Sequence, residues 1–411
     1  MRHLTAMNET DRKTKEAGAG RCNGHCAQCP RREACPARKA AGGSPILLSK
    51  MTRVGSSRNR DGVGFAVDVG STTLAAALYD LRTGDLLAGG GRMNPQASVA
   101  SDVIGRISAS EQPGGLERLQ RLASDAIETL LGETCASAGV AASSLADGVV
   151  TGNTVMLHLL TGRSPSSLGR APFNAEWLGG CGKPLAGRPV WFPPCLGAFV
   201  GADLLCALIA AGLDREEGPD ALLCDIGTNA EVAVRANGTV FATSTAAGPA
   251  FEGTGVRGSE LLDAIAGFLA SGKISETGAS APGSLVLDDG RTLDNADVRA
   301  VQVAKAAVAA GISVMLDEAG TSAEALSEIF LAGGFGCGLN PVSAERIGML
   351  PSAPGAKKTP IGNAALTGAA ILLLHPERRE AALRLARRAR LVELGGNSVF
   401  AGRFIDAMMF E

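Results

Sequence analysis

The sequence predicts an α/β protein of two duplicated lobes with a ligand cleft between them, preceded by a small cysteine-rich segment that binds a metal. The duplication shows as two runs of three strands followed by helices, which begin near residues 63 and 220. Each run opens with a buried strand that ends in Asp, an aliphatic residue, Gly and then Ser or Thr. Repetition of such a unit favours a two-lobed protein, and clefts between lobes are common ligand sites.

The composition also fits two lobes. With 411 residues, the chain exceeds the usual size of a single hydrophobic core, and 45% of its residues are hydrophobic. A net charge of −2 and an aromatic content of 4% argue against a nucleic-acid partner, which needs a basic field and stacking faces. The polar start lacks a signal-peptide pattern, and no apolar run approaches the roughly 18 residues of a membrane span. We therefore expect a cytoplasmic protein with no membrane segment.

Charge and composition divide the chain into five parts. The first 60 residues hold 13 Lys and Arg against 4 Asp and Glu, a net charge of +9, so the remainder of this −2 chain carries −11. The basic start suggests docking to an acidic partner, with a solvated tail as the alternative. The expected parts are a basic cysteine-rich segment (1–39), a linker (40–62), a first lobe (63–219), a second lobe (220–376), and a C-terminal helix and tail (377–411).

Hydrophobic periodicity and turn residues locate the elements of both repeats. In the first repeat we expect strands over 64–70, 73–80, 85–91 and 148–151, and helices over 99–110 and 116–138. In the second repeat we expect strands over 221–227, 231–235, 239–243 and 329–332, and helices over 259–271 and 297–318. A basic helix over 377–390 follows, either as an interface or as a solvated surface helix.

Each repeat carries a polar loop directly after its first strand, Asp68-Val-Gly-Ser-Thr-Thr73 in one and Asp225-Ile-Gly-Thr-Asn229 in the other. The glycine of each loop lets the backbone approach phosphate oxygens, and the following N–H groups and hydroxyls can donate to them. An aspartate at the strand end suits hydrated Mg²⁺ or the orientation of an attacking water. Alone, each motif is commonly just a hairpin turn, but two copies that open equivalent units favour a nucleotide site.

These motifs define the candidate site residues. Asp68 and Asp225 are the catalytic candidates, and which of them holds magnesium and which acts as a base stays open. A third motif, Leu331-Ala-Gly-Gly-Phe-Gly336, lacks side chains where a flat adenine or ribose could lie against the backbone. Glu252 and Glu260 are weaker candidates for the cleft. The cofactor-binding candidates are Gly70, Ser71, Thr72, Thr73, Gly227, Thr228, Asn229, Gly333, Gly334 and Gly336.

The segment Gly267-Phe-Leu-Ala-Ser-Gly-Lys273 is nearly a phosphate-binding Walker A loop. However, Ile274 stands where the magnesium-binding Ser or Thr belongs, and the segment closes a helix instead of following a strand. We expect an ordinary helix end there, with Gly272 as its cap.

Four cysteines, Cys22, Cys26, Cys29 and Cys35, are close enough in sequence for their thiolates to wrap one tetrahedral ion or one iron–sulfur cube. Spacing alone does not separate zinc from an iron–sulfur cluster. The remaining cysteines are scattered in apolar settings, which predicts small buried side chains, with Cys195 as the strongest exception. His158 is expected to be packed and not catalytic.

The three nucleotide motifs together resemble the phosphate-1, phosphate-2 and adenosine motifs of the ASKHA superfamily, which includes actin, sugar kinases and heat-shock chaperones. Gly152-Asn-Thr154 and the segment 362–369 fall where that superfamily places its two connecting helices at the hinge. The resemblance implies two RNase H-like lobes with a central nucleotide cleft that takes ATP and Mg²⁺.

Within the superfamily, segments 152–158, 168–173, 193–203 and 245–253 are similar to those of the reductive activators of corrinoid-dependent enzymes. This resemblance implies an ATPase coupled to electron transfer from a low-potential donor. It would reduce Co(II) to Co(I) in a corrinoid protein or corrinoid-dependent methyltransferase through an iron–sulfur cluster, for which four-cysteine spacing suits [4Fe-4S]. The usual plant-type ferredoxin domain and middle domain of that family are expected to be absent, with the short cysteine segment in their place.

Two other functions stay open on the sequence alone. One is a small-molecule kinase of the same fold, with a structural zinc in the cysteine segment. The other is a non-enzymatic nucleotide sensor or scaffold, in which the basic start docks a partner. Whether the chain forms a homodimer is also left open.

Overall fold

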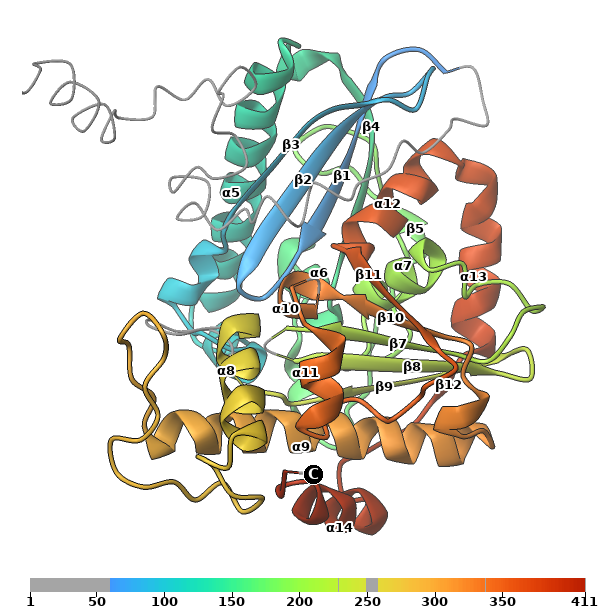
Figure 1. Ribbon diagram of the computed structural model, residues 1–411. Coiled ribbons are helices and arrows are strands. Elements are labelled where there is room, and N and C mark those ends of the chain that lie inside the picture. The colour runs from blue at the N-terminus through green and yellow to red at the C-terminus, as the bar shows by residue number, and fades with distance from the viewer. Residues whose placement is uncertain (1–59, 228, 249–257, 337, 411) are drawn as a thin grey trace, which may run out of the picture.

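The computed structural model describes residues 60–227, 229–248, 258–336 and 338–410 as two sheets surrounded by helices (Figure 1). The four cysteines of the N-terminal segment lie outside these residues, as do Thr228, Glu252 and Cys337. The sequence-based assignment of a metal segment to residues 1–39 therefore stays a prediction.

The first sheet contains β1 (Val63–Val69), β2 (Thr73–Asp80), β3 (Leu86–Met93), β4 (Leu145–Gly152), β5 (Cys181–Gly182) and β6 (Val190–Phe192). Its strand order is β3-β2-β1-β4-β6-β5. β2 runs antiparallel to β1, whereas β4 runs parallel to it. The carboxyl ends of β1 and β4 therefore meet at the same edge, where the first polar loop begins.

The second sheet contains β7 (Ala221–Ile226), β8 (Ala230–Ala236), β9 (Thr239–Thr245), β10 (Glu328–Ala332), β11 (Lys357–Gly362) and β12 (Arg390–Leu391). Its strand order is β11-β10-β7-β8-β9-β12. Again the second strand is antiparallel to the first, and the fourth is parallel to it. The duplication seen in the sequence is thus present in the strand order of both sheets.

Helices cover both faces of the first sheet. β1 sends Phe65 and Val67 into an apolar cluster with α5 (Gly115–Ala138), and the alternate residue Ala66 into a cluster with α12 (Ala364–Leu374). This alternation follows from the two-residue period of a strand. α5 supplies its apolar face through residues spaced three or four apart, and Gly139 ends the helix in a left-handed conformation.

The second sheet packs on α9 (Asn295–Ala319), which runs along β8 and β9, with α14 (Ser398–Asp406) on the other side of α9 (Figure 1). Asp294 and Asp297 form a capping box at the start of α9. By length and composition α9 could cross a membrane, but 72% of its apolar window is buried inside the protein, as expected for a core helix.

Two helices join the sheets, α7 (Ala202–Ala210) and α12. One apolar cluster includes residues of β1, α7, β7 and α12, so a single core continues from one sheet to the other. The two helices touch through their backbones, because a Cβ at Gly368 would lie 1.9 Å from the carbonyl oxygen of Cys206. This close crossing fixes how the two halves meet.

The remaining helices of the described residues are α4 (Val103–Ser110), α6 (Thr154–Leu160), α8 (Gly258–Ala270), α10 (Gly333–Gly336), α11 (Pro341–Arg346) and α13 (Arg379–Arg388). Short 3-10 turns lie at η3 (Pro95–Ser98), η4 (Ala142–Ser144), η5 (Ser166–Gly169), η7 (Ala323–Ala325) and η8 (Pro376–Arg378).

Several sequence expectations need correction. The helix expected from residue 99 begins only at Val103, because the Asp102 side chain caps it by accepting from the Gly105 N–H. The glycine turn expected after β10 is the short helix α10. The connecting helix expected at 152–154 is α6, which packs on α4 and α5, and its place at the interface is taken by α7.

Candidate functional site

The two polar loops lie at the carboxyl ends of β1 and β7. Asp68 and Asp225 occupy these ends, and Asp203 stands in the first turn of α7 beside them. The three carboxyl groups are close enough that Asp203 raises the pKa of Asp68, and both of these raise the pKa of Asp225. The structure therefore brings the two predicted aspartates to one place and adds a third that the sequence did not indicate.

The first loop is a tight turn with little room for side chains. A Cβ at Gly70 would lie 2.7 Å from the carbonyl oxygen of Thr73, and one at Gly152 would lie 2.6 Å from that of Val69. Gly152 also has a φ of +156°, which L side chains rarely adopt. The turn at residues 70–73 therefore leaves no room for a side chain at position 70, and its contact with a ligand stays a prediction.

Three side chains hold this loop from behind. Asn94 Nδ2 donates to the carbonyl oxygen of Gly70 at 2.9 Å, and Asn153 Nδ2 donates to the hydroxyl of Ser71 at 3.1 Å. Arg106 Nη2 donates to the carbonyl oxygen of Ser71 at 2.7 Å. These bonds satisfy the carbonyl oxygens of Gly70 and Ser71 and fix the position of the Ser71 hydroxyl.

Arg106 is a fully buried cation beneath the loop. Its guanidinium also donates to the carbonyl oxygen of Ala100 at 3.0 Å, and it is 0% exposed. Burial lowers its pKa to about 10, so it stays charged at neutral pH. The sequence offered no signal for this role, since one arginine within an amphipathic helix is ordinarily solvated.

The second loop is closed by a hydrogen bond from the N–H of Gly227 to the carbonyl oxygen of Asn229, at 3.0 Å. The glycine motif after β10 lies directly against it. A Cβ at Gly333, which has a φ of +84°, would lie 2.4 Å from Asp225 Oδ1 and 2.6 Å from the carbonyl oxygen of Ile226. Gly333 is thus required by the second loop itself.

The other two glycines of that motif differ in their surroundings. Within the described part of the chain, no atom beyond the chain neighbours of Gly334 and the backbone of α10 lies within 4 Å of where its Cβ would stand, so this position faces open space. Gly336 is buried inside α10. Of the three candidates for adenosine contact, Gly334 is the one whose position is free for a ligand.

A fourth carboxylate, Glu231, completes an acidic group beside the two loops. It is paired with Asp225 across β7 and β8, and Ser244 Oγ lies 3.5 Å from its carboxylate. Burial raises the pKa of Asp68 and of Asp225 to about 7 and that of Asp203 to about 6, and it also raises the pKa of Glu231. Each of the four keeps part of its surface accessible. At neutral pH this group is therefore partly protonated before any cation binds.

The acidic group suits a cation that arrives with its own ligands. Among residues 60–227, 229–248, 258–336 and 338–410, no three His, Cys, Asp or Glu side chains are arranged to hold a metal by themselves. Mg²⁺ is usually bound through one or two carboxylates together with water and substrate phosphates. The carboxylates between the two loops therefore fit magnesium that enters with a nucleotide.

The weaker candidates lie elsewhere. Glu260 is on the surface of α8 and is paired with Arg291, so it does not reach the loops.

Cys195 is 2% exposed and packed like Cys135, Cys206 and Cys224, and burial raises the pKa of its thiol to about 12. The expected exception at Cys195 is therefore wrong.

His158 is buried and packed, as predicted. Its Nδ1 is 2.7 Å from the carbonyl oxygen of Thr154, and Trp177 stacks edge-on against the ring at 5.6 Å between centroids.

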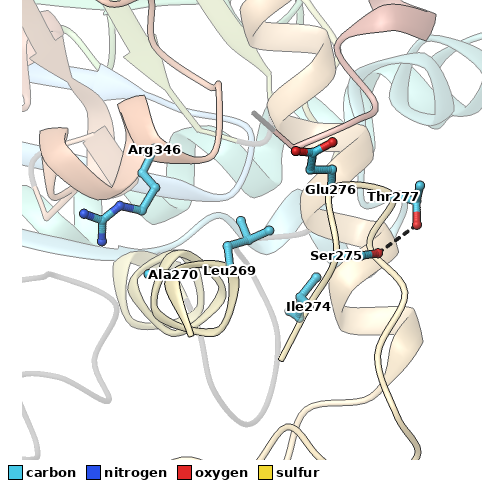
Figure 2. Close-up of a pocket in the computed structure, with 7 residues that line it drawn as sticks. All are labelled: Leu269, Ala270, Ile274, Ser275, Glu276, Thr277 and Arg346. Carbon is cyan, nitrogen blue, oxygen red and sulfur yellow. Dashed lines mark hydrogen bonds between the residues drawn. The ribbon is translucent and has the colours of Figure 1, made fainter. Parts of the chain in front are cut away.

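A separate pocket of about 590 Å³ opens at the end of α8, lined by Leu269, Ala270, Ile274, Ser275, Glu276, Thr277 and Arg346 (Figure 2). Gly272 ends α8 there with a φ of +69°, and its N–H donates to the carbonyl oxygen of Leu269. The segment that resembles a Walker A loop is thus a helix end, as predicted. None of the candidate nucleotide residues lines this pocket.

Comparison with known proteins identifies both halves of the chain. Residues 63–216 match the RACo middle region, and residues 220–258 and 254–411 match the C-terminal domain of RACo, the ASKHA domain. The chain is also 30% identical over 418 residues to the corrinoid activation enzyme RamQ of Eubacterium limosum, which covers 84% of this chain and 70% of that protein. The chain belongs to the RACo family. The predicted resemblance is thereby confirmed.

Two further proteins are also similar to this chain. A [Co(II) methylated amine-specific corrinoid protein] reductase of Methanosarcina barkeri is 24% identical over 274 residues, 53% of this chain and 49% of that protein. The solved structure of a reductive activator for corrinoid,iron-sulfur protein superposes with a TM-score of 0.77 and 27% identity, covering 86% of this chain and 67% of that one.

The RACo comparison corrects one expectation. The family's middle domain was predicted to be absent, but residues 63–216, which form the first sheet and its helices, match the RACo middle region. The error arose because this region has the same strand order as the ASKHA half, so it was interpreted as an actin-like lobe only.

Proposed function

We propose that this RACo-family protein is an ATP-dependent reductive activator that reduces the cobalt of a corrinoid protein, or of a corrinoid-dependent methyltransferase, from Co(II) to Co(I). The observation that carries the proposal is the meeting of two glycine-containing phosphate loops and their aspartates in a chain 30% identical to a corrinoid activation enzyme. Each cycle would add one electron to cobalt, taken from a low-potential donor.

The nucleotide half of the reaction is assigned to the two loops. N–H groups and hydroxyls of residues 70–73 and 227–229 would donate to the phosphate oxygens. Asp68 and Asp225 would hold hydrated magnesium or orient the attacking water, and magnesium when bound neutralises phosphate charge. Asp203 and Glu231 stand close enough to share these tasks. Gly334 is the position where adenosine would contact the backbone.

The electron half is assigned to the N-terminal segment. The thiolates of Cys22, Cys26, Cys29 and Cys35 would hold a [4Fe-4S] cluster, which supplies one-electron transfer when bound. Zinc is the alternative ligand for the same four thiolates. ATP would supply work by favouring the arrangement of the two halves in which the partner's cobalt is easier to reduce.

Product analysis of ATP turnover tests the nucleotide assignment. With a Co(II) corrinoid protein present, we expect the terminal phosphate of ATP to pass only to water. The carboxylates of the site can orient an attacking water, and its N–H groups and hydroxyls can donate hydrogen bonds to the phosphate oxygens. Asp225→Asn should lower turnover by about 100-fold or more. The control is Asp125→Asn, an exposed position on α5, which should behave as wild type. Phosphate transferred to a small molecule, or full turnover by Asp225→Asn, would contradict the assignment.

A further inference from the structure

Two Gly-Asn pairs, each directly after a parallel strand, converge on the first phosphate loop. Gly152 ends β4 and Asn153 caps α6, whereas Gly362 ends β11 and Asn363 caps α12. Both glycines have a positive φ, which turns the chain sharply from strand to helix. One pair comes from each half of the chain.

In both pairs the asparagine caps its helix, and this fixes the orientation of the amide. Asn153 Oδ1 accepts from the N–H of Met156 at 2.9 Å, and Asn363 Oδ1 accepts from the N–H of Leu366 at 2.7 Å. An N–H can pair only with the oxygen end of the amide, so each Nδ2 must point away from the helix. Each asparagine therefore presents a donor of known direction.

Both donors reach the same loop. Asn153 Nδ2 donates to Ser71 Oγ at 3.1 Å, whereas Asn363 Nδ2 donates to Asp68 Oδ2 at 2.9 Å. Asn363 is only 8% exposed, so most of its side chain is withdrawn from water. Residues 68–71 are thus held by a donor from their own half and by a donor from the opposite half.

We propose that Asn363 is a positioning residue for Asp68, reaching across from the ASKHA half so that the first loop is correctly set only when the two halves meet. Asn153 plays the matching role for Ser71 from within the first half. This inference rests on the proposed function, since it assumes that the loop binds nucleotide phosphates. It assigns to the duplicated Gly-Asn pairs a task beyond helix capping.

The electrostatic surroundings of Asp68 show why a donor is needed there. Burial raises its pKa to about 7, the Asn363 hydrogen bond lowers it, and Asp203 raises it further. Among the residues that the structure describes, the titratable groups that act on it are Asp203 and Cys206 of α7 and Asp225 of β7, and none of these is cationic. Donation from Asn363 therefore fixes the position of Asp68 Oδ2 beside the acidic side chains of Asp203 and Asp225.

The variant Asn363→Asp separates positioning from capping. Aspartate caps a helix about as well as asparagine, but it replaces the donor to Asp68 with a second carboxylate. We expect the acidic limb of kcat/KM for ATP hydrolysis to move upward by about one pH unit, with about tenfold lower kcat/KM below it. The matched control is Asn397→Asp, because Asn397 caps the surface helix α14 through Val399 and Phe400 and should leave the profile unchanged.

A second readout needs no nucleotide. An Asp whose pKa is higher in the folded than in the unfolded protein makes the protein less stable as pH rises between the two values. The Tm of Asn363→Asp should therefore fall more steeply from pH 5 to 8 than the Tm of wild type or of Asn397→Asp. Identical slopes and profiles in all three proteins would overturn the positioning role while leaving the proposed function intact. No ATP turnover in wild type, with the steeper slope still present, would overturn the proposed function alone.

Discussion

Buried polar side chains behind the first loop explain how its backbone keeps its shape. Arg106 occupies space that would ordinarily be apolar, and its donors satisfy the carbonyl oxygens of Ser71 and Ala100. The same residue reaches Gln96 Oε1 at 3.3 Å, which links the loop to the segment before α4. A cation in this place also adds favourable potential for an anionic ligand on the other side of the loop.

Replacing Arg106 should therefore lower the stability of the protein. Arg106→Met leaves the buried acceptors unpaired, and each such group costs about 1–3 kcal/mol, so the free energy of unfolding in urea should fall by at least that amount. The control Arg118→Met changes an exposed arginine of the adjacent α5 and should stay within about 0.5 kcal/mol of wild type. Equal stability of the two variants would contradict the structural role of Arg106.

At this scale, residues whose role is local were predictable and residues that act over long range were not. Asp68 and Asp225 were visible because each is followed directly by Gly and a hydroxyl residue. Asp203 and Asn363 were not assigned roles, because what matters is their approach to Asp68 from another part of the chain. Gly333 was assigned to adenosine, yet its missing side chain is explained by contact with Asp225.

The crossing of α7 and α12 is the element on which the relation of the two halves depends. Both helices are apolar on nearly every side, and they meet without side chains between them at Gly368. At its start α12 presents Asn363 to Asp68, and near its end the carbonyl oxygen of Leu373 accepts from Arg60. One helix thus connects the phosphate loop to the point where the N-terminal part of the chain joins the first sheet.

Gly368→Ala tests this crossing. In an exposed helix interior Gly→Ala gains about 0.5–1 kcal/mol, but here the added Cβ would meet the Cys206 backbone at 1.9 Å and must push the helices apart. We expect a net loss of about 1–3 kcal/mol in urea unfolding. Gly132→Ala in α5 is the matched control, because nothing in the described chain lies within 4 Å of its Cβ, and it should be neutral or stabilising. A stabilising Gly368→Ala would show that the crossing is looser than described.

Elements with strong periodicity or clear caps were predicted well, and short or context-dependent ones were missed. β1, β7, α5 and α9 lie within a few residues of their expected bounds. β5 and β12 have two residues each, too few to show any alternation. The sequence did not predict α14, because this helix is stabilised by the Asn397 cap and by packing against α9.

On the scale of the whole molecule, the fold divides the proposed reaction between two regions. The proposed nucleotide site lies where the carboxyl ends of β1 and β7 meet, between the residues that match the RACo middle region and those that match the ASKHA domain. The candidate cluster ligands belong to residues 1–39, which lie outside the part of the chain that the structure describes. Arg60, the first described residue, is paired with Asp147 and donates to the carbonyl oxygen of Leu373 at the end of α12.

The most direct measurement follows the visible absorption of a Co(II) corrinoid protein under anaerobic conditions, with a low-potential reductant and catalytic amounts of this protein. We predict that Co(I) accumulates with wild type and ATP, and that it fails to accumulate without ATP. Cys26→Ser should still hydrolyse ATP yet lose reduction, whereas Cys181→Ser, outside the proposed cluster ligands, should reduce cobalt as wild type does. Reduction at an equal rate without ATP, or unchanged reduction by Cys26→Ser, would contradict ATP-driven electron transfer through the N-terminal cysteines.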